Sequence, residues 1–338
     1  MSCSYADGLS PYDDKGVLGA PEKFDDAEKL DTKCNLLAKQ ISEARHVVFH
    51  TGAGISTTAG IPDFRGPNGV WTLEKKGLKP NVNISFNDAV PTKTHMALKQ
   101  LVDLGMVKYI VSQNIDGLHL RSGLKREFLS ELHGNMFIEQ CDTCEKQFIR
   151  HSATTSVGQK LLDKNCPRVK LTGRACRGKI RDTVLDWEAN LPDLDLKLSE
   201  LHSSVADLNI CLGTTLQIVP SGNLPLNTLK YGGRMVIVNL QATKHDKKAD
   251  MIINAYVDDV MVKVMKKLGL EIPEYTPEMD PSKTEGLHDG SKLIEWTIFK
   301  DDLNSAKKLH EIHCKNFKKR KLEMKDIKKK IKKEEVEE

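Results

Sequence analysis

The chain has 338 residues, of which 39% are hydrophobic and 29% are charged, and its formal net charge is +4. This length and composition allow about two domains with a sizeable core and exclude a miniature scaffold that depends on disulfides. The longest apolar runs fall well short of the ~20 residues of a membrane helix, and eight scattered cysteines without a secretory signal pattern indicate a reducing intracellular compartment.

The predicted elements alternate between helices and strands along the first three quarters of the chain. Apolar residues at helical spacing predict a helix over 26–44, which leads into a buried strand that begins at Val47. Further strands are predicted at 109–112, 208–212 and 236–239, with helical patterns between them, such as 94–103. This alternation predicts an α/β fold with a doubly wound parallel sheet (Rossmann-like), whose ligands bind beyond the carboxyl ends of the strands.

A glycine-rich turn follows the first predicted strand. Gly52 and Gly54 allow the backbone to turn tightly and to approach a pyrophosphate, and the N–H groups that follow would face the anion. The third glycine of the dinucleotide-binding fingerprint is missing. From this segment alone, a structural turn and a cofactor site are about equally good interpretations.

A small inserted module is predicted between about residues 135 and 181, where periodicity fades and cysteines and basic residues take over. Cys141 and Cys144 have the two-residue spacer of a zinc site, and Cys166 and Cys176 supply two more thiolates. Four thiolates close a tetrahedral shell, so one structural Zn²⁺ per chain is predicted. Scattered reduced cysteines are the alternative.

The composition changes again after residue 272. A stretch rich in Pro, Gly, Ser and Thr predicts a linker, and a helical pattern from Lys292 leads into lysine-rich sequence. Lys318 to Lys321 and the lysines from 325 to 333 predict a nuclear import signal and contact with DNA. The alternative is a solvated, lysine-rich helix end.

Five segments occur in the order and spacing of one enzyme family. They are GAGIS (52–56), IPDFR (61–65), SQNIDGLH (112–119), ELHGN (131–135) and GTTLQIVPSGNLP (213–225). On these motifs the chain resembles the sirtuins. The segments PYDDKG, GVWTLE and RDTVLDWEANLPD, with the wide spacing of the second cysteine pair, resemble the sirtuin-6 branch most. The resemblance covers roughly residues 1–272.

The resemblance implies an NAD-dependent protein-lysine deacylase that acts on histones and produces nicotinamide and O-acyl-ADP-ribose. It implies an N-terminal extension over 1–25, a catalytic domain over 26–272 that includes the zinc module, and a linker with a flexible basic tail over 273–338. Mono-ADP-ribosyl transfer at the same site, or a chromatin-bound scaffold, are the alternatives. A dehydrogenase is disfavoured by the missing glycine and by ELHGN.

The resemblance also assigns the reacting residues. His133 is implied as the general base on a ribose hydroxyl, a role that suits imidazole near neutral pH. Asn114 and Asp116 are implied to hold the ribose and carboxamide, although turn stabilisation is their simpler role. The implied cofactor-binding residues are Gly52, Ala53, Gly54, Thr57, Asp63, Phe64, Arg65, Trp71, Gln113, His133, Gly213, Thr215, Asn239, Gln241 and Val257.

The expected substrates are acylated histone tails and other acyl-lysine proteins. Asp186 and Trp187 stand where many sirtuins have a peptide-binding turn, so the peptide is expected to add as a strand between domains. Nucleosomes or DNA are expected partners in the nucleus, at chromatin, without membrane insertion. An acyl channel for long chains, or simply core, is expected from Val70, Val82, Phe86, Ile115, Met136 and Leu185.

Overall fold

The computed structural model describes residues 8–80, 84–170 and 172–337, with side chains described as far as residue 323. Within these ranges six strands form a parallel sheet in the order β10-β9-β8-β1-β2-β3. The strands are β1 (Val47–Thr51), β2 (Val107–Ser112), β3 (Leu129–Glu131), β8 (Leu208–Leu212), β9 (Arg234–Val238) and β10 (Met251–Ile253). The predicted doubly wound sheet is confirmed, and its strand order reverses direction at β1.

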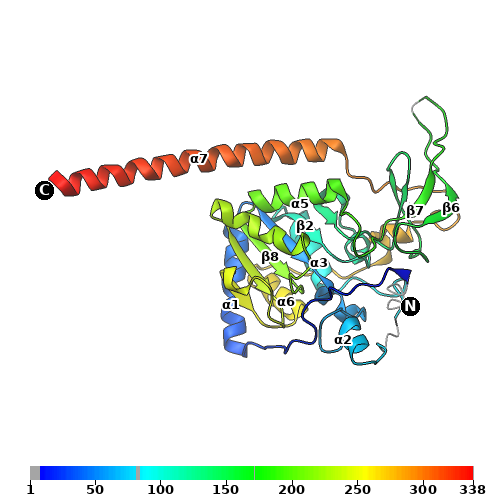
Figure 1. Cartoon of the computed structure of the whole chain (residues 1–338), viewed down its shortest axis with the longest axis horizontal. Coiled ribbons are helices and arrows are strands. Elements are labelled where there is room, and N and C mark those ends of the chain that lie inside the picture. Colours follow the sequence, from blue (N-terminus) through cyan, green and yellow to red (C-terminus); the bar gives the residue numbers. More distant parts are fainter. Residues whose placement is uncertain (1–7, 81–83, 171, 338) are drawn as a thin grey trace.

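Helices cover both faces of this sheet (Figure 1). On one face α1 (Ala27–Glu43), α3 (Lys93–Asp103) and α6 (Val257–Lys267) pack together, and on the other α5 (Asp193–Val205) packs against η5 (Ser221–Tyr231). Local sequence explains where two of them begin. Asp26 caps α1 by accepting from Lys29 N over 2.9 Å, and Thr92 and His95 form a capping box at the start of α3.

The buried strand β1 divides its side chains between two cores. Val47 and Phe49 pack with the helices of the first face, whereas Val48 packs with residues of α5 on the second face. All five residues of β1 are buried, as expected for a central strand of a parallel sheet that is covered on both sides. The apolar run that predicted this strand therefore serves both layers.

Short helical elements connect the main ones. They are α2 (Val70–Lys75), α4 (Leu118–Arg121), η2 (Ala53–Ile55), η3 (Thr57–Ala59), η4 (Arg126–Phe128), η6 (Asp246–Lys248), η7 (Pro277–Met279) and η8 (Pro281–Lys283). No helix in the described ranges is long and apolar enough to cross a bilayer.

A second, smaller sheet lies within the predicted zinc module. Its strands are β4 (Ile138–Cys141), β5 (Gln147–Ile149), β6 (Leu161–Asn165) and β7 (Lys179–Asp182), antiparallel in the order β5-β4-β7-β6. Phe148 and Ile180 form a separate small core with the four clustered cysteines. The module projects from one end of the main domain (Figure 1).

The C-terminal region departs from the prediction in two ways. The expected linker packs against the domain, with Asp280 only 1% and Trp296 only 6% exposed. The expected helix from Lys292 begins at Lys300 instead, as α7 (Lys300–Glu337), because residues 294–296 lie extended beside β5. α7 packs on α5, and its second half extends beyond the rest of the molecule (Figure 1).

Candidate functional site

A cavity of about 470 Å³ opens at the carboxyl ends of β1, β2, β8 and β9. This is the position at which doubly wound sheets bind ligands, where loops leave the sheet in opposite directions. All the predicted catalytic and cofactor-binding residues line this cavity except Thr57 and Val257. The fold therefore brings together motifs that lie far apart in the sequence.

The glycine-rich turn after β1 is locked against the turn after β8. Gly52 N donates to Leu212 O over 3.0 Å, and Gly54 N donates to Gly213 O over 2.9 Å. A Cβ atom on Gly54 would lie 2.7 Å from Gly213 Cα, and one on Gly52 would lie 2.7 Å from Thr214 Cβ. Both glycines are therefore required by packing between the turns, and the same two turns form one wall of the cavity.

Asn114 and Asp116 tie the loop after β2 to the glycine-rich turn. Asn114 Nδ2 donates to Gly52 O over 3.1 Å and to Ser56 Oγ over 3.3 Å, and Ser56 Oγ donates to Asp116 Oδ2 over 2.7 Å. Burial raises the pKa of the Asp116 carboxyl, while hydrogen bonds from Leu118 N and Ser56 oppose that shift. Ser56 thus joins both predicted residues, a contact that the sequence reasoning did not identify.

His133 enters the cavity from the loop after β3. Its Nδ1 lies 2.9 Å from Gln113 O, a carbonyl that can only accept, so Nδ1 carries the proton and Nε2 holds the lone pair. Nε2 lies 3.3 Å from Ser221 Oγ. Burial lowers the pKa of His133, although the bond to Gln113 opposes this, so the ring is neutral at pH 7. A neutral imidazole whose Nε2 holds the lone pair is the form required of a general base.

The loop that carries Asp63, Phe64 and Arg65 is held by contacts within the site. Gly66 N donates to Asp63 Oδ1 over 2.7 Å, and burial raises the pKa of this carboxyl. Arg65 Nε donates to Lys15 O over 2.9 Å, and its Cζ lies 4.6 Å from the centre of the Trp71 ring. Arg65 and Phe64 therefore pack against Trp71, and all three are predicted cofactor-binding residues.

Aromatic rings gather beside this loop. Trp71 lies 4.8 Å from Phe64 and 5.2 Å from Trp187 between ring centres, and Tyr12 stacks on Trp187 at 5.6 Å. Ser10 Oγ donates to Asp186 over 2.6 Å, which lowers the pKa of that carboxyl. The sequence reasoning did not single out Tyr12 or Ser10. The family match of the PYDDKG segment, which contains Tyr12, was the available signal.

The remaining predicted cofactor residues occupy two kinds of position. Asn239 and Gln241 line the cavity after β9, where Gln241 Nε2 donates to Ala20 O over 2.7 Å and to Arg65 O over 3.1 Å. Thr57 is exposed on η3 and Val257 is buried in the core at the start of α6. The cavity does not reach Thr57 or Val257, so their contact with a cofactor stays a prediction.

The four predicted metal ligands converge in the small sheet. Their sulfur atoms all lie within 4.8 Å of one another, with 3.8 Å between Cys141 and Cys176 and 3.8 Å between Cys144 and Cys166. A tetrahedron with Zn–S bonds of about 2.3 Å has edges of about 3.8 Å. The thiolates therefore fit one structural zinc ion that leaves no open coordination position.

Known proteins resemble this chain in sequence and in fold. A model described as the Sir2 family matches residues 78–220. A Drosophila melanogaster protein named NAD-dependent protein deacetylase Sirt6 is 60% identical over 307 residues, which cover 90% of this chain and 95% of that protein. The chain belongs to the Sir2 family, the sirtuins.

Two further comparisons agree with this sirtuin assignment. An Arabidopsis thaliana protein named NAD-dependent protein deacetylase SRT1 is 46% identical over 302 residues, which cover 88% of this sirtuin and 63% of that protein. A solved structure described as Sir2 with a p53 peptide and NAD⁺ matches with a TM-score of 0.53 and 33% identity, covering 69% of this sirtuin and 98% of that chain. Sirtuins use NAD as a co-substrate, and the predicted resemblance is confirmed.

Proposed function

We propose that this sirtuin removes acyl groups from lysine side chains of proteins and consumes NAD in doing so. The relatives with 60% and 46% identity are both named NAD-dependent protein deacetylases, which supports the reaction class. The observation that carries the proposal is the tautomer of His133, a cavity-lining residue whose Nδ1 donates to Gln113 O and whose Nε2 therefore holds the lone pair. NAD bound in this cavity would supply an electrophilic ribose carbon for the acyl oxygen of the lysine, with nicotinamide as the leaving group.

One side chain of the site removes a proton from the cofactor's ribose, and the others hold the cofactor in place. His133 Nε2 takes a proton from a ribose hydroxyl, for which a neutral ring is needed. Asn114 and Asp116, linked through Ser56, form a rigid part of the cavity lining that would hold the ribose. Asp63, Phe64 and Arg65 cover it from the neighbouring loop, and the turns of Gly52 and Gly213 present backbone to the phosphates.

Apolar side chains in the cavity lining are available to an acyl chain. Of the residues predicted for an acyl channel, Val70, Phe86, Ile115 and Leu185 line the cavity. Met136 packs in the neighbouring core cluster together with Phe86, and Val82 lies outside the described residues. This lining supports removal of acyl chains longer than acetyl, as a part of the proposal.

Mono-ADP-ribosyl transfer is a second candidate, because the same ribose carbon would be captured by a protein nucleophile in the same cavity. The cavity lining includes the half-buried Asp186 and the exposed Asn190, which supports access for a protein substrate. A scaffold without chemistry is disfavoured, because the catalytic and cofactor positions are brought together around one cavity.

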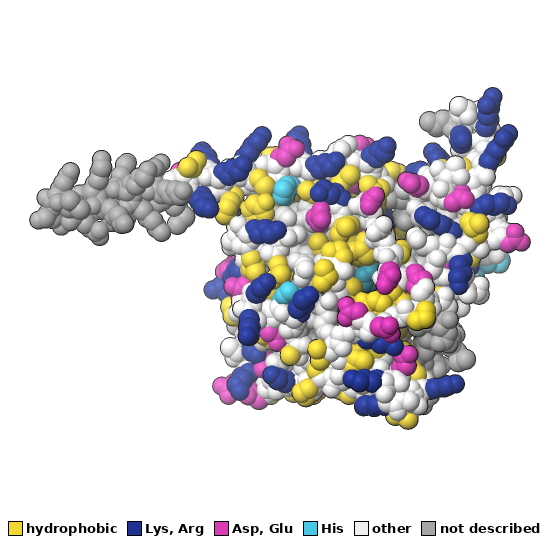
Figure 2. All heavy atoms as spheres, viewed as in Figure 1, with side chains coloured by type: hydrophobic (Ala, Val, Ile, Leu, Met, Phe, Trp, Pro, Cys, Tyr) yellow, Lys and Arg dark blue, Asp and Glu magenta, His cyan; other side chains and the backbone are white. Residues whose placement is uncertain are grey.

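We propose histones as substrates, and nucleosomes or DNA as partners in the nucleus. Figure 2 shows lysine and arginine side chains gathered on the zinc module and along α7. Exposed members of these surfaces are Lys170, Arg174, Arg177, Lys179, Lys318, Lys319, Arg320 and Lys321. Such surfaces attract phosphate backbones and acidic proteins, which supports a chromatin partner.

The test is a product analysis with the full chain, NAD and acylated histone peptides. Equimolar nicotinamide, O-acyl-ADP-ribose and free lysine, detected by mass spectrometry, are expected. ADP-ribose attached to protein without loss of the acyl group would favour the transferase instead. NAD that remains intact with every acyl peptide would contradict both enzymatic proposals.

A further inference from the structure

A segment near the C-terminus pairs through an isolated β-bridge with the edge of the zinc module. Ile149 N donates to Ile294 O over 2.9 Å, and Trp296 N donates to Gln147 O over 2.8 Å, in an antiparallel arrangement. Gln147 N also donates to Thr297 Oγ1 over 3.0 Å. We call residues 293–299 the strap. Its backbone adds to the edge of β5 and carries one large side chain, Trp296, into the interior.

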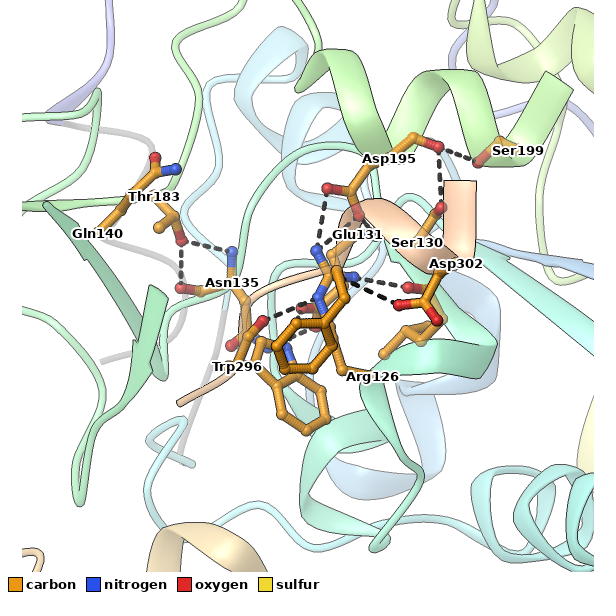
Figure 3. Close-up of polar contacts among 12 residues, drawn as sticks. Arg126, Ser130, Glu131, Asn135, Gln140, Thr183, Asp195, Ser199, Trp296 and Asp302 are labelled. Atoms are coloured by element: carbon orange, nitrogen blue, oxygen red, sulfur yellow. Dashed lines mark hydrogen bonds and ion pairs between the residues drawn. The ribbon is translucent and has the colours of Figure 1, made fainter. Parts of the chain in front are cut away.

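Trp296 reaches the base of the loop that presents His133. Its indole Nε1 donates to Glu131 Oε2 over 3.0 Å, and its backbone carbonyl accepts from Arg126 Nε over 3.2 Å. Figure 3 shows Trp296, Arg126 and Glu131 converging between α5, the strap and the zinc module. Only 6% of the Trp296 side chain is exposed, so the indole N–H is withdrawn from water and committed to the carboxylate.

Glu131 ties together both ends of the ELHGN loop. Its Oε1 accepts from Asn135 Nδ2 over 2.5 Å, while its backbone N donates to Asp195 Oδ1 over 2.8 Å. Arg126 holds Asp195 through Nη2 at 2.8 and 2.9 Å. The buried Glu131 carboxylate thus links the first and last residues of the segment 131–135, and His133 is the middle residue of that segment.

We propose that Trp296 is a positioning residue for His133, acting through Glu131. The inference rests on the proposed function, in which His133 is the base. A carboxylate that is 6% exposed needs a donor for each oxygen, and Trp296 is the side-chain donor to Oε2. Without it, the carboxylate is free to turn away from Asn135, and the loop loses one of the contacts that keep His133 beside Gln113.

The matched variants are Trp296→Phe and Thr297→Val. The first keeps a ring in the pocket and removes the donor to Glu131, whereas the second removes one hydrogen bond between the strap and β5 without touching the loop. We expect kcat to fall about tenfold in Trp296→Phe, with little change in KM for NAD. The substitution removes a hydrogen bond to the Glu131 carboxylate, which supports the loop of His133 and does not line the cofactor cavity. Thr297→Val should keep kcat within twofold of wild type. Equal kcat in the two variants would overturn the inference.

A double-mutant cycle tests whether the effect passes through Glu131. In Glu131→Gln, the amide can accept from Asn135 only by turning its own NH₂ toward the Trp296 N–H, which places two donors together. Adding Trp296→Phe removes that conflict, so the double variant should be at least as active as Glu131→Gln alone. Multiplication of the two single losses would show independent roles and overturn the inference.

Hydrogen exchange separates this inference from the proposed function. Deuterium uptake should rise in peptides covering residues 129–137 of Trp296→Phe, with peptides of α1 unchanged and with Thr297→Val as the reference. This readout needs no turnover. A wild-type chain without deacylase activity would contradict the proposed function alone, whereas unchanged uptake at 129–137 would overturn the role of Trp296 even in an active enzyme.

Discussion

The guanidinium of Arg121 donates from Nε to Asp280 Oδ2 over 2.9 Å, and the two side chains are 1% and 0% exposed. The same guanidinium donates from Nη1 to Phe86 O over 3.0 Å and to Ala89 O over 2.6 Å. Tyr275 OH adds a further bond of 2.9 Å to the Asp280 carboxylate. Arg121 therefore joins the segment after residue 272 to the loop that lines the cavity at Phe86.

Asp280→Ala should destabilise the fold by about 3–5 kcal/mol, because it leaves the guanidinium of Arg121 buried without its counter-ion. Urea unfolding measures the change. Glu278→Ala is the matched control, since that carboxylate is exposed two residues away and should change stability by less than about 0.5 kcal/mol. Equal midpoints for the two variants would show that the buried pair contributes nothing.

His133→Tyr should abolish deacylation and any ADP-ribosyl transfer together while it leaves the melting temperature nearly unchanged. The side chain lies at the cavity, where a larger ring has space, and it contributes to the chemistry and not to the core. Activity measured with NAD and an acetyl-peptide decides this. A rate within tenfold of wild type, a change of only about 1.4 kcal/mol in the barrier, would remove His133 from the mechanism.

Acid should weaken the fold below pH 6.5 because several histidines are buried in neutral form. Burial lowers the pKa of His50, His95 and His202 to about 3 and that of His46 to about 4. The unfolded chain binds these protons near pH 6.5 and the folded chain does not, so stability falls as pH falls, by about 1.4 kcal/mol per histidine at pH 5.5.

Urea unfolding at pH 7.5 and pH 5.5 measures that difference, and His202→Phe supplies the comparison. The His202 ring stacks on Tyr109 with centres 4.1 Å apart, so phenylalanine preserves the stacking and removes one titrating group. The free energy of unfolding of His202→Phe should fall less between pH 7.5 and pH 5.5 than that of wild type, by about 1.4 kcal/mol. An identical pH dependence would show that His202 is not held neutral.

Zinc should be present at one ion per chain, and Cys166→Ser should lower stability by about 3 kcal/mol or more, because binding energy at a closed site is folding energy. Metal analysis and thermal unfolding measure the two quantities. The strap pairs with β5 of the same module, so loss of zinc should affect the strap only when the module unfolds. Activity should therefore fall in parallel with stability. A folded, metal-free variant that is catalytically dead would contradict a purely structural role.

Removal of residues 318–338 should leave turnover on a short acetyl-peptide intact and weaken binding to DNA. Lys318 to Lys321 are exposed, and each basic side chain that no longer neutralises a phosphate should reduce the slope of log K against log salt by roughly 0.9. Titration of labelled DNA at several salt concentrations measures the slope. An unchanged slope would move the DNA-binding surface to the zinc module, at exposed residues such as Lys170, Arg174 and Arg177.

Local sequence predicted the four central strands of the sheet but not β3 and β10, and the family resemblance supplied most of the cavity residues. The strand at Val47 begins with an apolar run and is followed by Gly52, and residues 208–212 form the predicted strand without any shift. The cavity residues follow such strands directly, so motifs that end a strand could be placed at one edge of the sheet. His133 was found from its family motif, because a lone histidine has no local signal for catalysis.

No local sequence pattern predicted the contacts that the C-terminal region makes with the domain. Arg121 and Asp280 lie 159 residues apart, and the composition around Asp280 is that of a linker. Apolar spacing around Trp296 fits a helix, yet pairing with β5 keeps the strap extended, since the edge of a sheet offers backbone partners that sequence does not reveal. Tertiary pairing decided the conformation in both places.

The hydrogen bond between Trp296 and Glu131 can form only late in synthesis of the chain. The two residues are 165 positions apart, so at about 5–20 residues per second the ribosome adds Trp296 roughly ten to thirty seconds after Glu131. The parallel sheet and the four cysteines all precede the strap, so a nascent chain can build the sheet and load metal while Glu131 Oε2 still lacks its indole donor. A stalled or prematurely released chain would therefore carry an assembled cavity in which Glu131, at the start of the His133 loop, still lacks its hydrogen bond from Trp296.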